Sequence, residues 1–137
     1  MKKTMTILLI LTAAGGLALT ACGGGGASLD GTSWVLTDLN GSAPVAGRTV
    51  TADFADGQVG GDAGCNSYGG SYNTTGNRLS TSDLFSTLMA CPEQGVMDQE
   101  SAYLKLLGDA ASYQVNGSQL VITTSGGETL TFTAAGS

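Results

Sequence analysis

Two cysteines, Cys65 and Cys91, are the residues of this sequence with the clearest chemistry. A disulfide between them would close a loop of about 26 residues, and such a bridge stabilises a fold by about 3.5 kcal/mol, mainly by restricting the unfolded chain. Small exported domains in oxidising compartments commonly use such bridges. We therefore hypothesise a Cys65–Cys91 disulfide. Two separately buried free thiols and a redox-active pair are the alternatives, although no Cys-x-x-Cys spacing supports the latter.

The sequence lacks the residue sets on which most enzymes depend. It contains 0 histidines, which removes Ser-His-Asp and Cys-His nucleophiles and histidine zinc sites. Asp53, Asp56 and Asp62 offer carboxylate oxygens of the kind that bind calcium, but their spacing matches no EF-hand loop, and Asp56 suits a turn. Nothing suggests a cleft in which Asp53 and Asp56 would act as an acid–base pair. We expect no enzyme, catalytic residue, metal or cofactor.

Three aromatic residues form a candidate ligand groove. Tyr68 and Tyr72 lie on one face of a predicted strand with Gly70 between them, and Trp34 lies on the first predicted strand. Core and cross-strand packing is the other interpretation of these three rings. A partly open barrel with such a lining would bind a small hydrophobic ligand or a lipid.

The N-terminus has the features of an export signal. Met1-Lys2-Lys3 is positively charged, and the apolar run from Met5 to Leu19 is shorter than the roughly 20 residues that span a bilayer. Leu19-Thr20-Ala21-Cys22 resembles a bacterial lipobox, which implies cleavage between Ala21 and Cys22 and acylation of Cys22, with palmitate among the chains. An ordinary secretory signal with an incidental cysteine is the alternative.

These features predict three segments. Residues 1–21 are the lipoprotein signal peptide, residues 22–28 are the lipidated cysteine with a glycine-rich flexible tether, and residues 29–134 form one small domain. In the lipoproteins that this N-terminus resembles, a residue other than aspartate after the cysteine usually directs export to the outer membrane. Gly23 fits that pattern, so we expect a lipid-anchored envelope protein, facing the periplasm from the outer membrane.

The charge of the mature chain excludes nucleic acid as a partner. Removing residues 1–21 leaves three basic residues, Arg48, Arg78 and Lys105, against 11 acidic residues, so the net charge is −8. Three scattered basic residues cannot form a stripe that binds phosphates. Electrostatic attraction to an anionic lipid surface is equally unsupported. We therefore expect the lipid on Cys22 to provide the attachment to the membrane, and an envelope protein or lipid to be the partner.

Alternating apolar residues and turn signals predict a mostly antiparallel β domain. Val50, Ala52 and Phe54 are expected to face inward, as are Leu130 and Phe132. Pro92 is expected to open one helix at about 92–109, packed on the sheet. The predicted fold class is α+β, a curved antiparallel sheet or half-barrel of about eight short strands. The strand-like stretches are 33–39, 48–54, 58–61, 68–72, 78–82, 84–89, 111–115, 119–124 and 128–133.

Several motifs in a fixed order resemble those of the META domain, the HslJ-like family, which includes a heat-inducible bacterial lipoprotein. They are Gly31-Thr32-x-Trp34-x-Leu36, Gly64-Cys65-Asn66-x-Tyr68-x-Gly70-x-Tyr72, Thr87-x-Met89-Ala90-Cys91-Pro92, Gln99-Glu100 and Leu130-x-Phe132. The resemblance covers residues 29–134. It implies an antiparallel half-barrel with a helix against it, a role in heat-shock and envelope stress response, and no established reaction. We expect a non-enzymatic, membrane-anchored lipoprotein that supports stress tolerance through protein or lipid contacts, the alternative being a ligand binder.

Overall fold

The structure is a computed structural model that describes residues 27–136. The predicted signal peptide, the cleavage site at Ala21 and Cys22, and most of the tether lie outside the described residues. None of the helical segments that are described is long and apolar enough to span a membrane.

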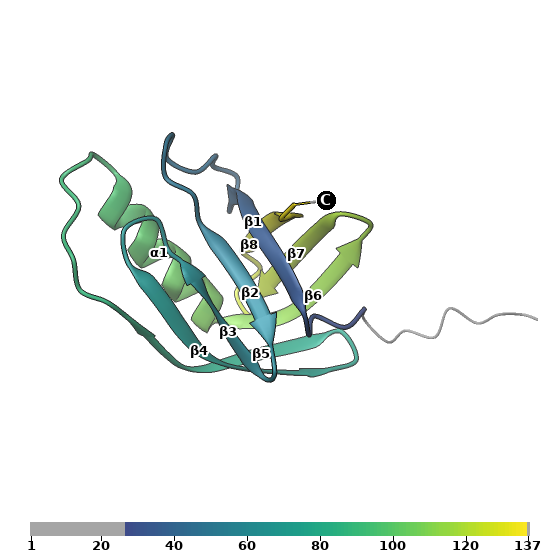
Figure 1. Cartoon of the computed structure of the whole chain (residues 1–137). Coiled ribbons are helices and arrows are strands. Elements are labelled where there is room, and N and C mark those ends of the chain that lie inside the picture. The colour runs from purple at the N-terminus through teal and green to yellow at the C-terminus, as the bar shows by residue number, and fades with distance from the viewer. Residues whose placement is uncertain (1–26, 137) are drawn as a thin grey trace, which may run out of the picture.

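Eight strands and one helix make up the described part of the chain, and every neighbouring pair of strands is antiparallel (Figure 1). The antiparallel sheet with one helix is therefore confirmed. The elements in chain order are β1 Thr32–Leu39, β2 Thr51–Ala55, β3 Gln58–Asp62, β4 Ser67–Thr75, β5 Arg78–Ser86, α1 Val96–Gly108, β6 Ala110–Asn116, β7 Gln119–Thr124 and β8 Thr129–Ala134.

The predicted half-barrel is in fact a closed barrel with the strand order β1 to β8. Closure comes from the pairing of the first strand with the last, with Leu36 opposite Phe132 and Leu39 opposite Leu130. Both strands bury alternate apolar residues, so pairing them completes one continuous core.

One junction of the barrel, between β5 and β6, is held by very few strand contacts. Arg78 opposite Ser112 is the single paired position between these strands, beside a bond from the Tyr113 N–H to the Asn77 carbonyl at 2.9 Å. Farther along β5, the strand contacts α1, and Thr81 Oγ1 donates to the carbonyl of Leu107 at 2.7 Å. We call this junction the seam. The sparse pairing at the seam explains why the half-barrel predicted from the sequence is close to the observed closed barrel.

The strand expected at residues 84–89 is instead the end of β5. Asp83 adopts a positive φ of 54°, and the pairing with β4 shifts between Gly69 and Ser71. Such a bulge inserts an extra residue and bends the strand without ending it. Residues 87–89 then leave the sheet in an extended segment that leads toward the helix.

The helix begins at Val96, four residues later than predicted. Gly95 precedes it with a φ of 82°, a left-handed conformation that cannot continue a right-handed helix in either direction. Pro92 therefore lies in the exposed connecting segment outside the helix. The predicted end near Gly108 is correct. Asp98 in the first turn and Lys105 in the last carry the charges that the helix dipole favours at each end.

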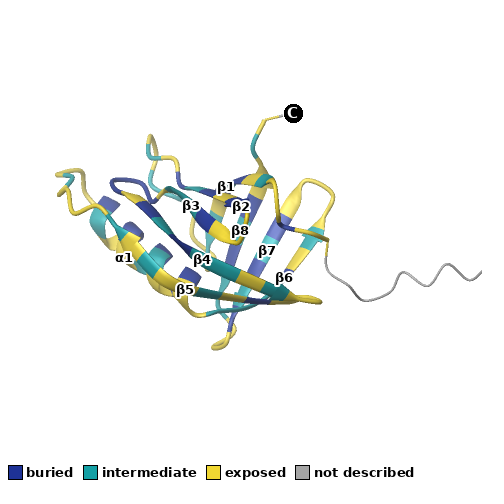
Figure 2. Ribbon diagram, turned by 60° about the horizontal axis from the view of Figure 1, so that its bottom comes forward, coloured by how far each residue is buried: buried dark blue, intermediate teal, exposed yellow. Residues whose placement is uncertain are grey.

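The predicted inward faces are confirmed. Val50, Ala52, Phe54, Leu130 and Phe132 are all buried. In Figure 2 the buried positions alternate along the strands and follow one side of α1. The helix contributes Tyr103, Leu106 and Leu107 to the same core, so the barrel and the helix share a single apolar interior.

Candidate functional site

The disulfide hypothesised from the sequence is present. Cys65, in the turn between β3 and β4, is bonded to Cys91, in the segment between β5 and α1. Cys65 is buried and Cys91 is half-buried. The bridge therefore attaches the connecting segment to the edge of the barrel shortly before the helix begins.

Asn66, next to Cys65, is the centre of a buried hydrogen-bond network. Its amide nitrogen donates to the carbonyl of Met89 at 3.0 Å, and its amide oxygen accepts from the Met89 N–H at 2.6 Å. The same oxygen accepts from Thr87 Oγ1 at 2.9 Å. One side chain thus holds both backbone polar groups of Met89, much as a neighbouring strand would.

Glu100 on α1 completes this network from the helix side. Its carboxylate is buried and accepts from the backbone N–H groups of Cys65 at 3.1 Å and Asn66 at 2.7 Å, and from the Asn66 amide at 2.6 Å. These three donors compensate the cost of burying a carboxylate without a cation. The neighbouring Gln99 accepts from the Val45 N–H at 2.5 Å.

Sequence reasoning gave Asn66, Gln99 and Glu100 no individual role. A signal was present in the helix, because Glu100 follows Val96 by four residues and precedes Tyr103 by three. That spacing puts the three residues on one face, so an apolar core face would have to accommodate a carboxylate. The polar partner of that carboxylate lies 34 residues away along the chain, at Asn66.

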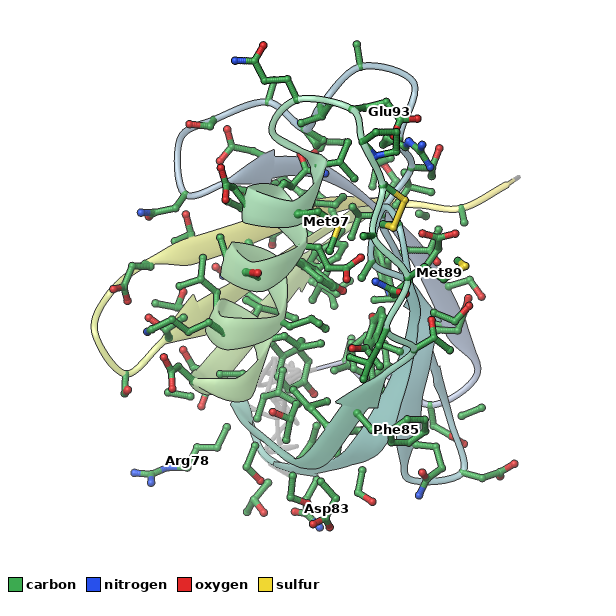
Figure 3. The ribbon with its side chains drawn as sticks, turned by 90° about the vertical axis from the view of Figure 1, so that its left-hand side faces the viewer. Arg78, Asp83, Phe85, Met89, Glu93 and Met97 are labelled. Carbon is green, nitrogen blue, oxygen red and sulfur yellow. A yellow bond between two sulfur atoms is a disulfide. The ribbon has the colours of Figure 1, made fainter. Side chains whose placement is uncertain are left out.

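The end of β5 and the connecting segment carry an exposed apolar surface, which we call the apolar ridge and define as Phe85, Leu88 and Met89. Their exposed fractions are 68%, 95% and 60%. Figure 3 labels Phe85 and Met89. The Phe85 ring lies over Gly69 of β4, where an added Cβ would approach the ring to 2.8 Å. The glycine thus leaves room for the ring on the outer face of the sheet.

Acidic residues lie at both ends of the apolar ridge. Asp83 precedes it and is exposed, and Glu93 follows it and pairs with Arg48. Figure 3 shows Asp83, Phe85, Met89 and Glu93 along one side of the molecule. A hydrogen bond from its own backbone and the guanidinium of Arg48 hold the pKa of the Glu93 carboxyl below its ordinary value, so Glu93 is ionised at neutral pH.

The three aromatic residues proposed as a ligand groove occupy separate places in or against the core. Trp34 is buried and donates to Thr32 Oγ1 at 2.8 Å. Tyr68 is buried on β4, whereas Tyr72 is half-buried with its ring edge-on to Phe54 at 5.0 Å. The structure brings each ring into packing contacts with other core residues rather than around a shared hollow.

Tyr68 and Tyr103 form a buried pair that joins the sheet to the helix. Their hydroxyl oxygens are 2.7 Å apart, and the Tyr68 hydroxyl donates to the carbonyl of Thr51 at 2.8 Å. Burial raises the pKa of both phenols well above the ordinary value, because ionisation would leave a charge in the apolar core. Both groups remain neutral and act as a structural link.

A surface hollow of about 400 Å³ lies at the seam. Its lining is mixed, with Arg78 as the charged residue and no carboxylate or thiol that would act as a base or nucleophile. None of the three predicted groove residues contributes to it. The hollow is lined by Asn73, Thr75, Arg78, Leu79, Ser80, Ala110 and Ala111.

Of the aspartates considered for calcium, Asp62 has a structural partner and Asp56 lies in a turn. Asp56 has a φ of 52° in the turn between β2 and β3, and Asp62 accepts from the Gly64 N–H at 2.7 Å. Within residues 27–136, no three histidine, cysteine, aspartate or glutamate residues gather in a group that would hold a metal ion.

Comparison with known proteins gives one family and two related structures. The model of the META domain matches residues 27–137. An NMR structure of a protein from Burkholderia xenovorans is 33% identical, with a TM-score of 0.70, over 80% of this chain and 85% of that chain. A second NMR structure is 21% identical, with a TM-score of 0.63, over 76% of this chain and 89% of that chain, and shows the same fold. The sequence has no significant match among curated proteins.

Proposed function

Because this chain belongs to the META domain family, we propose that it is a non-enzymatic lipoprotein of the cell envelope, anchored through Cys22, that supports stress tolerance by contact with an envelope partner. The observation that carries the proposal is the apolar ridge, an exposed apolar surface held in place by a disulfide and a buried hydrogen-bond network. Surfaces of this kind are typical of interaction sites. The disulfide is also consistent with an oxidising compartment outside the cytoplasm.

The N-terminus supports an anchor close to the domain. The lipobox-like Leu19-Thr20-Ala21-Cys22 is followed by four glycines, and the described chain begins at Ala27, five residues after Cys22. The Ala27 carbonyl accepts from the hydroxyl of Tyr113 at 2.6 Å, which holds this point of the chain against β6. A lipidated Cys22 would therefore keep the barrel within about 17 Å of the membrane surface, at about 3.4 Å per extended residue.

The interior of the barrel gives less support to the alternative of a bound hydrophobic ligand. Phe54, Tyr103 and Phe132 are fully buried within one continuous apolar core. Filled interiors of this kind leave no room for a lipid chain without repacking. We therefore place the activity of the protein on its outer surface.

The anchor is tested by fractionating cells that produce the full chain, its Cys22→Ser variant or, as a matched control, Gly23→Ser. We expect the wild type and Gly23→Ser in the membrane fraction and Cys22→Ser in the soluble envelope fraction. The functional part is tested by deleting the gene and measuring survival under heat, detergent and antibiotics. Membrane association of Cys22→Ser, or unchanged survival of the deletion under every stress, would contradict the proposal.

A further inference from the structure

We propose that the apolar ridge is a docking surface for a protein whose binding site is an apolar pocket rimmed by basic side chains. The inference rests on the proposed function and names the surface and the class of partner. Three features lead to it: the ridge is exposed, it is held in place by hydrogen bonds, and both the adjacent Asp83 and the chain as a whole are acidic.

The ridge is held in place by a backbone hydrogen bond to β4 and by the buried side chain of Asn66. The N–H of Thr87 donates to the carbonyl of Ser67 at 3.0 Å, and Asn66 binds both backbone polar groups of Met89. Leu88 therefore lies between two fixed neighbours with its side chain 95% exposed. The disulfide attaches Cys91, two residues after Met89, to Cys65 at the barrel.

Exposing large apolar side chains to water is unfavourable, so side chains that are fixed in an exposed arrangement indicate an interaction surface. A connecting segment with more freedom would reduce the exposure of its apolar residues. A pre-ordered apolar surface loses little conformational entropy when a partner binds, which favours specific recognition. Phe85 extends the ridge onto the outer face of the sheet, while the adjacent Leu84 packs against the core.

The position of the ridge favours a protein over the anchoring membrane. The described chain begins at one end of the barrel, and the connecting segment lies at the opposite end in Figure 1. With Ala27 held on β6 and four residues between it and Cys22, the lipid would attach at the end away from the ridge. The ridge would then face outward from the membrane surface.

The charge around the ridge favours a basic partner. Asp83 precedes it and makes no ion pair within the described residues, whereas Glu93 on its other side is neutralised by its pair with Arg48. An anionic lipid surface would be repelled, and so would a second copy of this acidic chain, whose full sequence has a net charge of −6. Basic side chains around an apolar pocket would complement this pattern and fix its orientation.

The test is site-specific photocrosslinking of the full chain in its own cells. The photoreactive residue p-benzoylphenylalanine replaces Leu88 or, as the control, the exposed Gln119 on β7. We expect one protein adduct from position 88 and none from position 119. Adding Asp83→Lys should reduce the position-88 adduct at least five-fold, and mass spectrometry should identify a partner with a basic-rimmed apolar site. A lipid adduct, an adduct with a second copy, equal adducts at both positions, no adduct, or no response to Asp83→Lys would each overturn the proposal.

Complementation separates a failure of this inference from a failure of the proposed function. The doubly substituted Leu88→Ser, Met89→Ser chain should fold with an unchanged melting temperature, because both side chains project into solvent. We expect it to remain at the membrane but to leave the deletion strain stress-sensitive. Full rescue by this variant would overturn the docking surface while leaving the anchored, stress-protective role intact. A crosslink at position 88 that persists in the Cys22→Ser background would support the surface independently of the anchor.

Discussion

At the scale of single residues, Asn66 holds the connecting segment and the helix to the barrel. Its side chain makes four hydrogen bonds, with Thr87, Met89 and Glu100 as the partners. A buried polar group that loses its partner costs about 1–3 kcal/mol, so the effect of removing Asn66 exceeds that of one hydrogen bond.

Replacing Asn66 by alanine should therefore lower the free energy of unfolding by about 3 kcal/mol, because Glu100 and the Met89 backbone lose partners. Urea denaturation at neutral pH with an unchanged m-value measures the loss. The matched control is Asn73→Ala on β4, whose side chain is exposed and should change stability by less than about 0.5 kcal/mol. Equal effects at the two positions would show that the network is unimportant.

The Tyr68–Tyr103 pair predicts instability at alkaline pH. Burial raises both folded-state pKa values above the ordinary value of 10.0. The stabilisation is therefore fully present below about pH 10 and is lost as the pH rises, by about 1.4 kcal/mol per pH unit for each tyrosine. Tyr103→Phe should destabilise the protein by about 1 kcal/mol at pH 7 but halve the slope above pH 10. Denaturation of the wild type and of Tyr103→Phe between pH 8 and 11.5 measures how stability falls with pH, with Tyr72→Phe as the control. Equal slopes for the wild type and Tyr103→Phe would refute the prediction.

At the scale of elements, the disulfide joins two segments that no strand pairing connects. Its loop spans 26 residues, which corresponds to about 3.5 kcal/mol on the chain-entropy model. The doubly substituted Cys65→Ala, Cys91→Ala chain should lose about this much stability. Wild-type protein unfolded in the presence of a reductant should show the same loss, and the reductant should leave the variant unaffected. A loss below 1 kcal/mol would mean that the Asn66 network alone fixes the segment.

The start of the helix gives a second test between elements. Gly95→Ala should cost about 1 kcal/mol, because the φ of 82° at this position is strained for any residue with a Cβ. Pro92→Ala should change stability by less than about 0.5 kcal/mol, since Pro92 is exposed and outside the helix. Thermal or urea unfolding of both variants measures the difference. A larger loss of stability in Pro92→Ala than in Gly95→Ala would instead support a helix that begins at Pro92, as the sequence predicts.

These elements show what local sequence can predict. Alternation over Val50, Ala52 and Phe54 was sufficient to orient a strand, because a period of two depends on neighbouring residues alone. The helix start was wrong because proline fits both a first turn and the segment before one, and the conformation of Gly95 decides between them. The roles of Asn66 and Glu100 depend on contacts between distant positions, which spacing along the chain does not reveal.

At the scale of the whole molecule, closure of the barrel could not be read from local patterns. It requires β1 to meet β8 at the far end of the chain, and the alternation of each strand is compatible with an open or a closed sheet. The sequence nevertheless predicted nearly the correct shape, because the β5–β6 seam is held by one paired position and by α1. The barrel is continuous around β1, β7 and β8 and weakest at this junction.

The seam should therefore be the first part of the barrel to open. In native-state hydrogen exchange we expect the amide of Tyr113, bonded to Asn77, to exchange at least ten-fold faster than the paired amides of β7, which lie between two neighbouring strands. Thr81→Val removes the bond to Leu107 and should accelerate exchange at Tyr113 while leaving β7 unchanged. If both sets of amides exchanged together in the wild type and the variant, the barrel would open as one cooperative unit. A seam that opens alone would instead mean that β5 and β6 separate while β7 stays paired with β8.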